Sequence, residues 1–67
     1  MKCAVDLRDR ETGNTVSTLC VTDDPTFAWN MVADWNEENL PDYHPNKTSD
    51  DYIGHGSGLV ADCYYID

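Results

Sequence analysis

The chain has 67 residues, and 13 Asp and Glu against four Lys and Arg give it a formal net charge of -9. A chain this short forms one small domain, 1–67, that buries only about 60% of its unfolded surface, so a deep catalytic cleft and an enzyme are not expected. The negative charge repels nucleic acids, anionic lipids and nucleotide phosphates, and it favours a basic protein surface as the partner.

Cysteine usage and the start of the chain bear on the cellular compartment. Cys3, Cys20 and Cys63 are an odd number without a CxxC pair, so neither a complete disulfide framework nor a zinc site is indicated. No basic, apolar leader opens the chain, and no apolar run is long enough to cross a membrane. We therefore expect a cytoplasmic protein without a cofactor, whose three thiols are reduced and buried as small apolar side chains.

The first 22 residues predict a β-hairpin. Residues 2–9 alternate apolar and polar side chains, which is typical of a half-buried strand, and a second strand runs to residue 22. Between them, Gly13 stands where a type I turn followed by a bulge requires glycine. This turn predicts that Val5 faces Leu19.

The same register predicts that Cys3 faces Val21, which places four apolar side chains on the core face. A tighter two-residue loop would instead pair Cys3 with Cys20. We prefer the first register because Leu19 and Val21 are better core residues than the alternatives.

A helix is predicted over residues 25–40. Asp24 can cap its N-terminus, Pro25 suits the first helical position, and Leu40-Pro41 ends it. Its apolar residues follow helical spacing and are interpreted as the core stripe: Phe27, Ala28, Met31, Val32 and Trp35.

The remaining chain predicts a long polar loop, 41–58, and a third strand, 59–66. A right-handed crossover places the third strand beside the first. The fold class is therefore α+β, with the order β-β-α-β, a mostly antiparallel sheet of strand order 2-1-3 and one helix on one face. The other face stays open, and its candidate lining is Val16, Cys20, Val60 and Tyr64. An uncovered apolar sheet face often binds another protein or a second copy of the chain, so we expect a possible homodimer through this face.

The stretch GHGSG, residues 54–58, combines a histidine, a serine and three glycines. It does not fit a nucleophile elbow, and a phosphate loop would need a lysine and a following helix. We interpret it as a joint, that is, a glycine-rich turn that leads the chain into its last strand. His44 and His55 lie in the same loop as Asp42, Asp50 and Asp51 but lack the spacing of metal ligands, so no metal site is predicted.

The end of the helix is the candidate functional site. Asp34, Glu37 and Glu38 share one helix face in its last turns, where the helix dipole favours cations, and Asp34 repels Glu38. Residues that go against the charge preferences of a helix in this way are often found at functional sites. The alternative is that they belong to a solvated acidic surface that only keeps the protein soluble. We predict a partner-binding surface made of these acids with loop acids and nearby aromatics: Asp34, Glu37, Glu38, Asp42, Asp50, Asp51, Trp29, Tyr43 and Tyr52.

In size, acidity and layout the chain resembles small acidic phage proteins that act against host defences, of the anti-CRISPR and DNA-mimic anti-restriction kind. The resemblance lies in RDRETGNTV, residues 8–16, and AWNMVADWNEENL, residues 28–40. It implies a non-enzymatic inhibitor that blocks a host nuclease or nuclease complex in the host cytoplasm. The negative charge separately predicts no direct contact to nucleic acid or membrane.

Two other functions stay open. One is an oligomeric sponge for a small ligand such as a signalling nucleotide, whose phosphates only Lys2, Arg8, Arg10 and Lys47 could hold. The other is a metal-binding protein or hydrolase centred on His44, His55 and Ser57. The acidic inhibitor ranks first because the surface is poor in basic residues.

Overall fold

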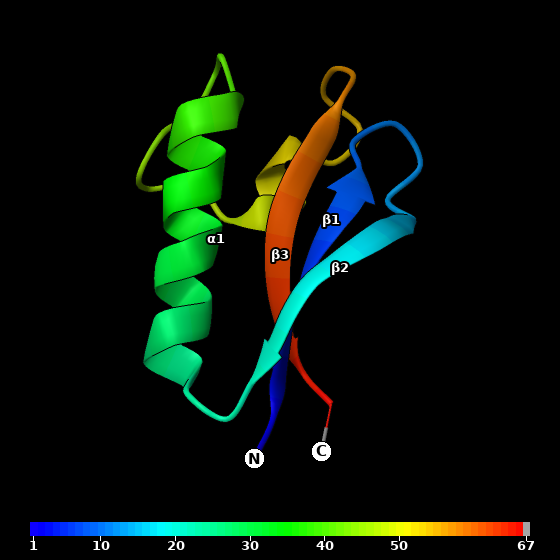
Figure 1. Cartoon of the computed structure of the whole chain (residues 1–67). Helices are drawn as coiled ribbons and strands as arrows, with labels where there is room; N and C mark the ends of the chain where they lie inside the picture. The colour runs from blue at the N-terminus through cyan, green and yellow to red at the C-terminus, as the bar shows by residue number, and fades with distance from the viewer. Residues whose placement is uncertain (67) are drawn as a thin grey trace.

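Three strands and one long helix make up the fold in a computed structural model that describes residues 1–66. In chain order they are β1 (Cys3–Asp9), β2 (Thr15–Thr22), α1 (Pro25–Asn39), a short 3-10 helix η1 (Ser49–Tyr52) and β3 (Leu59–Tyr65). The strand order is β2-β1-β3, and β1 runs antiparallel to both neighbours. Helix α1 lies along the sheet, and η1 lies in the connection to β3 (Figure 1). The predicted α+β class and strand order are confirmed.

The β1–β2 turn places Gly13 as predicted, but the strand pairing differs already beside the turn, where Arg8 faces Thr15 although the predicted register would pair it with Val16. Gly13 has a φ of 79°, and its N–H donates to the carbonyl of Asp9 at 2.7 Å. Two irregularities along the ladder then change the pairing, so that Val5 faces Cys20 and Cys3 faces Thr22. Both registers considered from the sequence are therefore wrong for Cys3.

The bulged ladder changes which side chains reach the core. Leu19 is 41% exposed and Val21 is 54% exposed, so their predicted burial is wrong. Cys20 instead packs against the core beneath the helix, with its Sγ 3.6 Å from Met31 Sδ. A bulge inserts an extra residue into one strand, and this shifts the alternation of faces beyond it.

Helix α1 begins and ends where the sequence indicates. Asp24 caps it by accepting hydrogen bonds from the backbone N–H groups of Thr26 and Phe27, at 3.0 and 3.2 Å. The residues that α1 buries form one i, i+4 row, namely Ala28, Val32 and Asn36. Four residues of the predicted stripe are buried or pack against the core, namely Ala28, Met31, Val32 and Trp35. Phe27, also predicted in the core, is 51% exposed, because the row through Ala28 and Asn36 is centred on the sheet and Phe27 lies at its margin.

The core has two parts. Between α1 and the sheet it contains small and sulfur-containing residues of β1, α1 and β3, which are Cys3, Val5, Ala28, Val32, Ala61 and Cys63. The second part joins Leu40, Tyr52 and Val60. The prediction that Val60 and Cys20 line an open sheet face is therefore wrong. Val16 and Tyr64, predicted on the same face, are exposed. The cysteines are free thiols, and burial raises the pKa of Cys63.

The outer edge of β3 is closed at its centre by side chains. Asn36 donates from its amide to the carbonyl of Ala61 at 3.1 Å and accepts from the Ala61 N–H at 2.8 Å. Ser49 of η1 donates to the same carbonyl at 2.6 Å. These bonds replace those of a neighbouring strand, since an unpaired edge otherwise exposes backbone groups.

Within residues 1–66, no helix combines the length and the apolar character that a membrane span needs.

Candidate partner-binding surface

The loop between α1 and β3 is organised around Arg10, a residue that sequence reasoning placed in a turn and considered only as a possible phosphate ligand. Its side chain is buried, with 4% of its area exposed. The guanidinium binds both carboxylate oxygens of Asp42, at 3.2 and 2.9 Å, and donates to the carbonyls of Tyr52 and His55. It also lies 5.5 Å from the centre of the Tyr52 ring. Arginine is suited to such a site because its planar fork makes paired bonds in fixed directions.

The GHGSG stretch wraps around this arginine. The carbonyl of Gly58 accepts from the Arg10 N–H at 2.9 Å, and the Gly54 N–H donates to the Arg10 carbonyl at 2.6 Å. Gly56 has a φ of 120°, and a Cβ there would lie 3.3 Å from Arg10 Nη2. The glycines thus allow the backbone to approach the guanidinium closely, as expected of a joint.

Two further cations are also used within the fold. Arg8 Nη1 binds Asp62 at 2.8 Å and Asp50 at 3.1 Å, and the hydrogen bond to Asp62 raises the pKa of Arg8. The ammonium of Lys47 lies 5.4 Å from the centre of the Tyr52 ring, on which Arg10 also stacks. Three of the four basic residues are therefore engaged by the chain itself.

The loop carboxylates predicted to bind a partner have structural roles. Asp42 holds Arg10, which lowers the pKa of that carboxyl, and Asp50 pairs with Arg8. Asp51 accepts from the backbone N–H of Thr48 at 2.8 Å and so caps η1. All three remain exposed to solvent, so they add to the surface potential, but two of them are partly neutralised by arginine.

The three predicted interface aromatics differ in exposure. Trp29 is 48% exposed on α1, and Tyr43 is half-buried against the second part of the core. Tyr52 is 1% exposed, and its hydroxyl accepts from the backbone N–H of His44 at 2.8 Å. Including Tyr52 in the partner-binding surface was therefore wrong, because its ring is a core side chain that supports the loop.

The three acids of α1 are placed as predicted on its outer side. Asp34, Glu37 and Glu38 are exposed, and none of them forms an ion pair within the described part of the chain. The last turn of α1 has no basic residue. We call these carboxylates the α1 acidic face; within residues 1–66 they differ from the loop acids in holding no ion pair.

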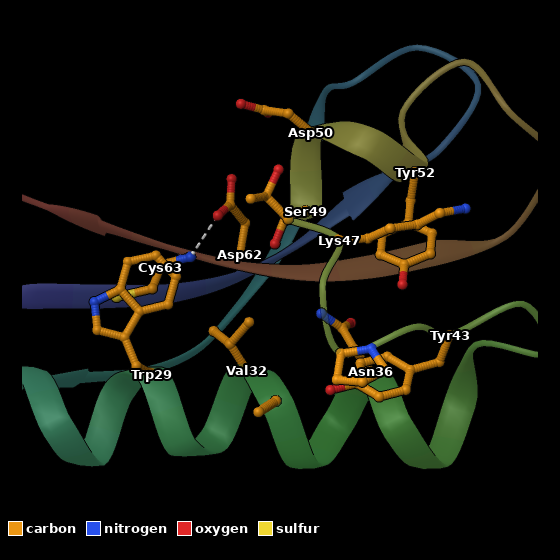
Figure 2. A pocket seen from close by; sticks show the side chains of 13 residues that line it. Trp29, Val32, Asn36, Tyr43, Lys47, Ser49, Asp50, Tyr52, Asp62 and Cys63 are labelled. Carbon is orange, nitrogen blue, oxygen red and sulfur yellow. Dashed lines mark hydrogen bonds between the residues drawn. The ribbon is translucent and has the colours of Figure 1, made fainter.

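Sequence reasoning missed two grooves on either side of this helix. The larger, of about 510 Å³, lies between α1 and the chain around η1. Figure 2 shows Trp29, Val32 and Asn36 of α1 on one side, with Ser49, Asp50 and Asp62 opposite and Tyr43 and Lys47 at one end. The smaller, of about 320 Å³, is formed by α1 alone, from Phe27, Asn30, Met31, Asp34, Trp35 and Glu38. Only the second could have been found from the sequence, since its lining follows i, i+4 spacing.

The two histidines considered for metal binding or catalysis make other contacts within the described residues. His44 uses its Nδ1 to accept from the Asn46 N–H at 3.2 Å, and His55 contributes its backbone carbonyl to Arg10. Among residues 1–66, no three His, Cys, Asp or Glu side chains are grouped so that they could hold a metal ion. The geometry therefore gives no support to the metal-binding hypothesis.

Comparisons with protein-family models, with curated proteins and with solved structures found no significant match.

Proposed function

We propose that the protein is a non-enzymatic binding protein whose α1 acidic face docks on a basic groove of a protein partner. The observation that carries this proposal is the contrast between the two groups of acids. The loop acids Asp42, Asp50 and Asp51 each hold a structural partner, whereas Asp34, Glu37 and Glu38 hold none within the described residues.

The α1 acidic face reduces the stability of its own helix. Asp34 and Glu38 repel each other at i, i+4 spacing, and both lie near the negative end of the helix dipole. Each of these two effects destabilises the helix by about a few tenths of a kcal/mol. A sequence that retains such a conflict without a compensating contact is typical of a functional surface. A basic partner would remove the repulsion and would be drawn in by charge.

The resemblance to phage anti-defence proteins suggests which partner this is. A protein that binds nucleic acid carries a basic groove for phosphates, and an acidic helix can occupy part of such a groove. We therefore propose inhibition of a host nuclease complex as the biological role, in a cytoplasmic setting.

The small-ligand sponge has less support than the acidic inhibitor. Arg10 is buried and already paired with Asp42, and Arg8 is held by two carboxylates. An anionic ligand in the larger groove would meet Lys47 but also Asp50 and Asp62. A phosphate would thus have to displace existing ion pairs or approach carboxylates, and both cost free energy.

The test is capture of a partner from a bacterial lysate, followed by measurement of its affinity with purified proteins. The variant is Asp34→Asn with Glu38→Gln, and the matched control is Glu11→Gln with Asp23→Asn, which removes the same charge from exposed sites outside α1 and its two grooves. We expect a basic protein that wild type and control retain at low salt and release at high salt. The proposal fails if the α1 variant, shown to be folded by circular dichroism, binds that protein as well as the control does.

A further inference from the structure

The smaller groove of α1 lies directly beside the acidic face, and it indicates what kind of surface docks there. We propose that the docking element of the partner is a cationic amphipathic α-helix that lies in this groove. The inference rests on the proposed function, because it assigns a shape and a chemistry to the same partner.

The shape of the groove fits a helix. Its two walls are rows of side chains at i, i+4 spacing, with Phe27, Met31 and Trp35 in one row and Asn30, Asp34 and Glu38 in the other. Rows of this spacing form the ridges of a helix, and the space between two rows accepts a ridge of another helix at a crossing angle of about -50°. A partner with one line of apolar side chains therefore fits along the groove.

The apolar wall is both exposed and anchored. Phe27 is 51% exposed, so about half of this large apolar side chain is available to a partner. Met31 and Trp35 are half-buried, because they pack against the core beneath α1. The inner part of the wall is thus held in place before a partner arrives, and this lowers the entropy lost on binding.

Charge selects the kind of helix. The opposite wall carries Asp34 and Glu38, with Glu37 next to them, and no ion pair within residues 1–66 neutralises any of the three. A partner helix that buries apolar residues against Phe27 must place its polar flank beside these carboxylates. Lys or Arg on that flank gains charge-assisted contacts, whereas an acidic helix is repelled. A second copy of α1 is excluded for the same reason.

The test uses a fluorescein-labelled peptide of Leu and Lys, arranged with Leu at i, i+3, i+4 and i+7, and the whole chain as its binder. Fluorescence anisotropy gives the dissociation constant at several salt concentrations. A peptide of the same composition but scrambled order, which has no apolar stripe, separates helix recognition from charge alone. We expect the amphipathic peptide to bind about tenfold more tightly than the scrambled one.

Two variants examine the two walls separately. Phe27→Ser is expected to weaken the amphipathic peptide about tenfold while leaving the salt dependence unchanged, because no charge is altered. Asp34→Asn with Glu38→Gln should weaken binding and flatten its salt dependence. The control, Glu11→Gln with Asp23→Asn, should stay within about twofold of wild type.

The outcomes distinguish this inference from the function on which it rests. If the scrambled peptide binds equally well, or Phe27→Ser has no effect, the helix-in-groove inference is wrong while the acidic face stands. If Asp34→Asn with Glu38→Gln behaves like the control, both proposals are wrong. Circular dichroism of every variant confirms that a loss of binding is not a loss of fold.

Discussion

At the scale of single residues, the fold depends on polar side chains that complete the bonding of the backbone. The buried polar and charged residues are Asp6, Arg10, Asn36 and Ser49. Asn36 and Ser49 bind the backbone of Ala61, and Arg10 binds the carbonyls of the glycine loop region. Among the described residues, no buried side-chain nitrogen or oxygen lacks a hydrogen-bond partner. Because a buried unpaired polar group is costly, each of these residues is hard to replace.

Asn36 gives the sharpest prediction at this scale. Asn36→Leu keeps the branched shape of the side chain, although it is larger, and removes both bonds to Ala61, whose N–H then has no partner. We expect the free energy of unfolding to fall by about 2–3 kcal/mol, measured by urea denaturation. Ser49→Ala is the comparison, since the Ala61 carbonyl keeps Asn36, and about 1 kcal/mol is expected. Equal losses in both variants would contradict this account of the β3 edge.

The roles of these residues could not be predicted from the sequence, for a physical reason. Asn36 meets Ala61 at a separation of 25 residues, and Arg10 meets Asp42 at a separation of 32. Local patterns identify a turn at Arg10 and a polar position on a helix at Asn36, but not their distant partners. The positive φ of Gly13, in contrast, follows from the local hairpin turn, and it was predicted correctly.

At the scale of elements, α1 was predictable because its signals are local. Asp24 and Pro25 mark its start and Leu40-Pro41 its end, and the structure confirms both. Strand β2 was found, but its register was not, because the register shifts at two irregularities that the alternation of apolar and polar residues does not reveal. The exposure of Phe27 follows from the tertiary fit of α1 against the sheet. Sequence reasoning missed this exposure, although the residues that line the groove beside Phe27 are regularly spaced along the helix.

The charge conflict of α1 leads to a prediction in which stability and binding change in opposite directions. Glu38→Lys replaces a repulsive pair with Asp34 by an attractive one, and it puts a cation in the last turn of the helix. We expect it to raise the free energy of unfolding by about 0.5–1 kcal/mol relative to Glu11→Lys, which makes the same charge change in an exposed turn. Binding to the basic partner should be lost only in Glu38→Lys. A decrease in stability would show that Glu38 has a contact within the fold.

At the scale of the whole molecule, the net charge of -9 opposes folding because like charges are brought together. Arg8, Arg10 and Lys47 reduce the repulsion between carboxylates only around the loop, where they pair with acids or lie over the Tyr52 ring. Salt should therefore stabilise the protein by screening the remaining carboxylates. We expect the Tm to rise by several degrees between about 20 mM and about 300 mM NaCl, followed by circular dichroism. A falling Tm would mean that the Arg8 and Arg10 ion pairs outweigh the repulsion.

The closed centre of the β3 edge limits how copies of this protein can join. Asn36 and Ser49 occupy the backbone groups of Ala61 that an added strand would need, whereas β2 at the other edge pairs only with β1. Growth of a β-sheet from molecule to molecule requires two free edges on each subunit. With one edge blocked, two molecules joined through β2 would present blocked edges on both outer sides. Strand addition would therefore terminate at a dimer and could not propagate into a fibre.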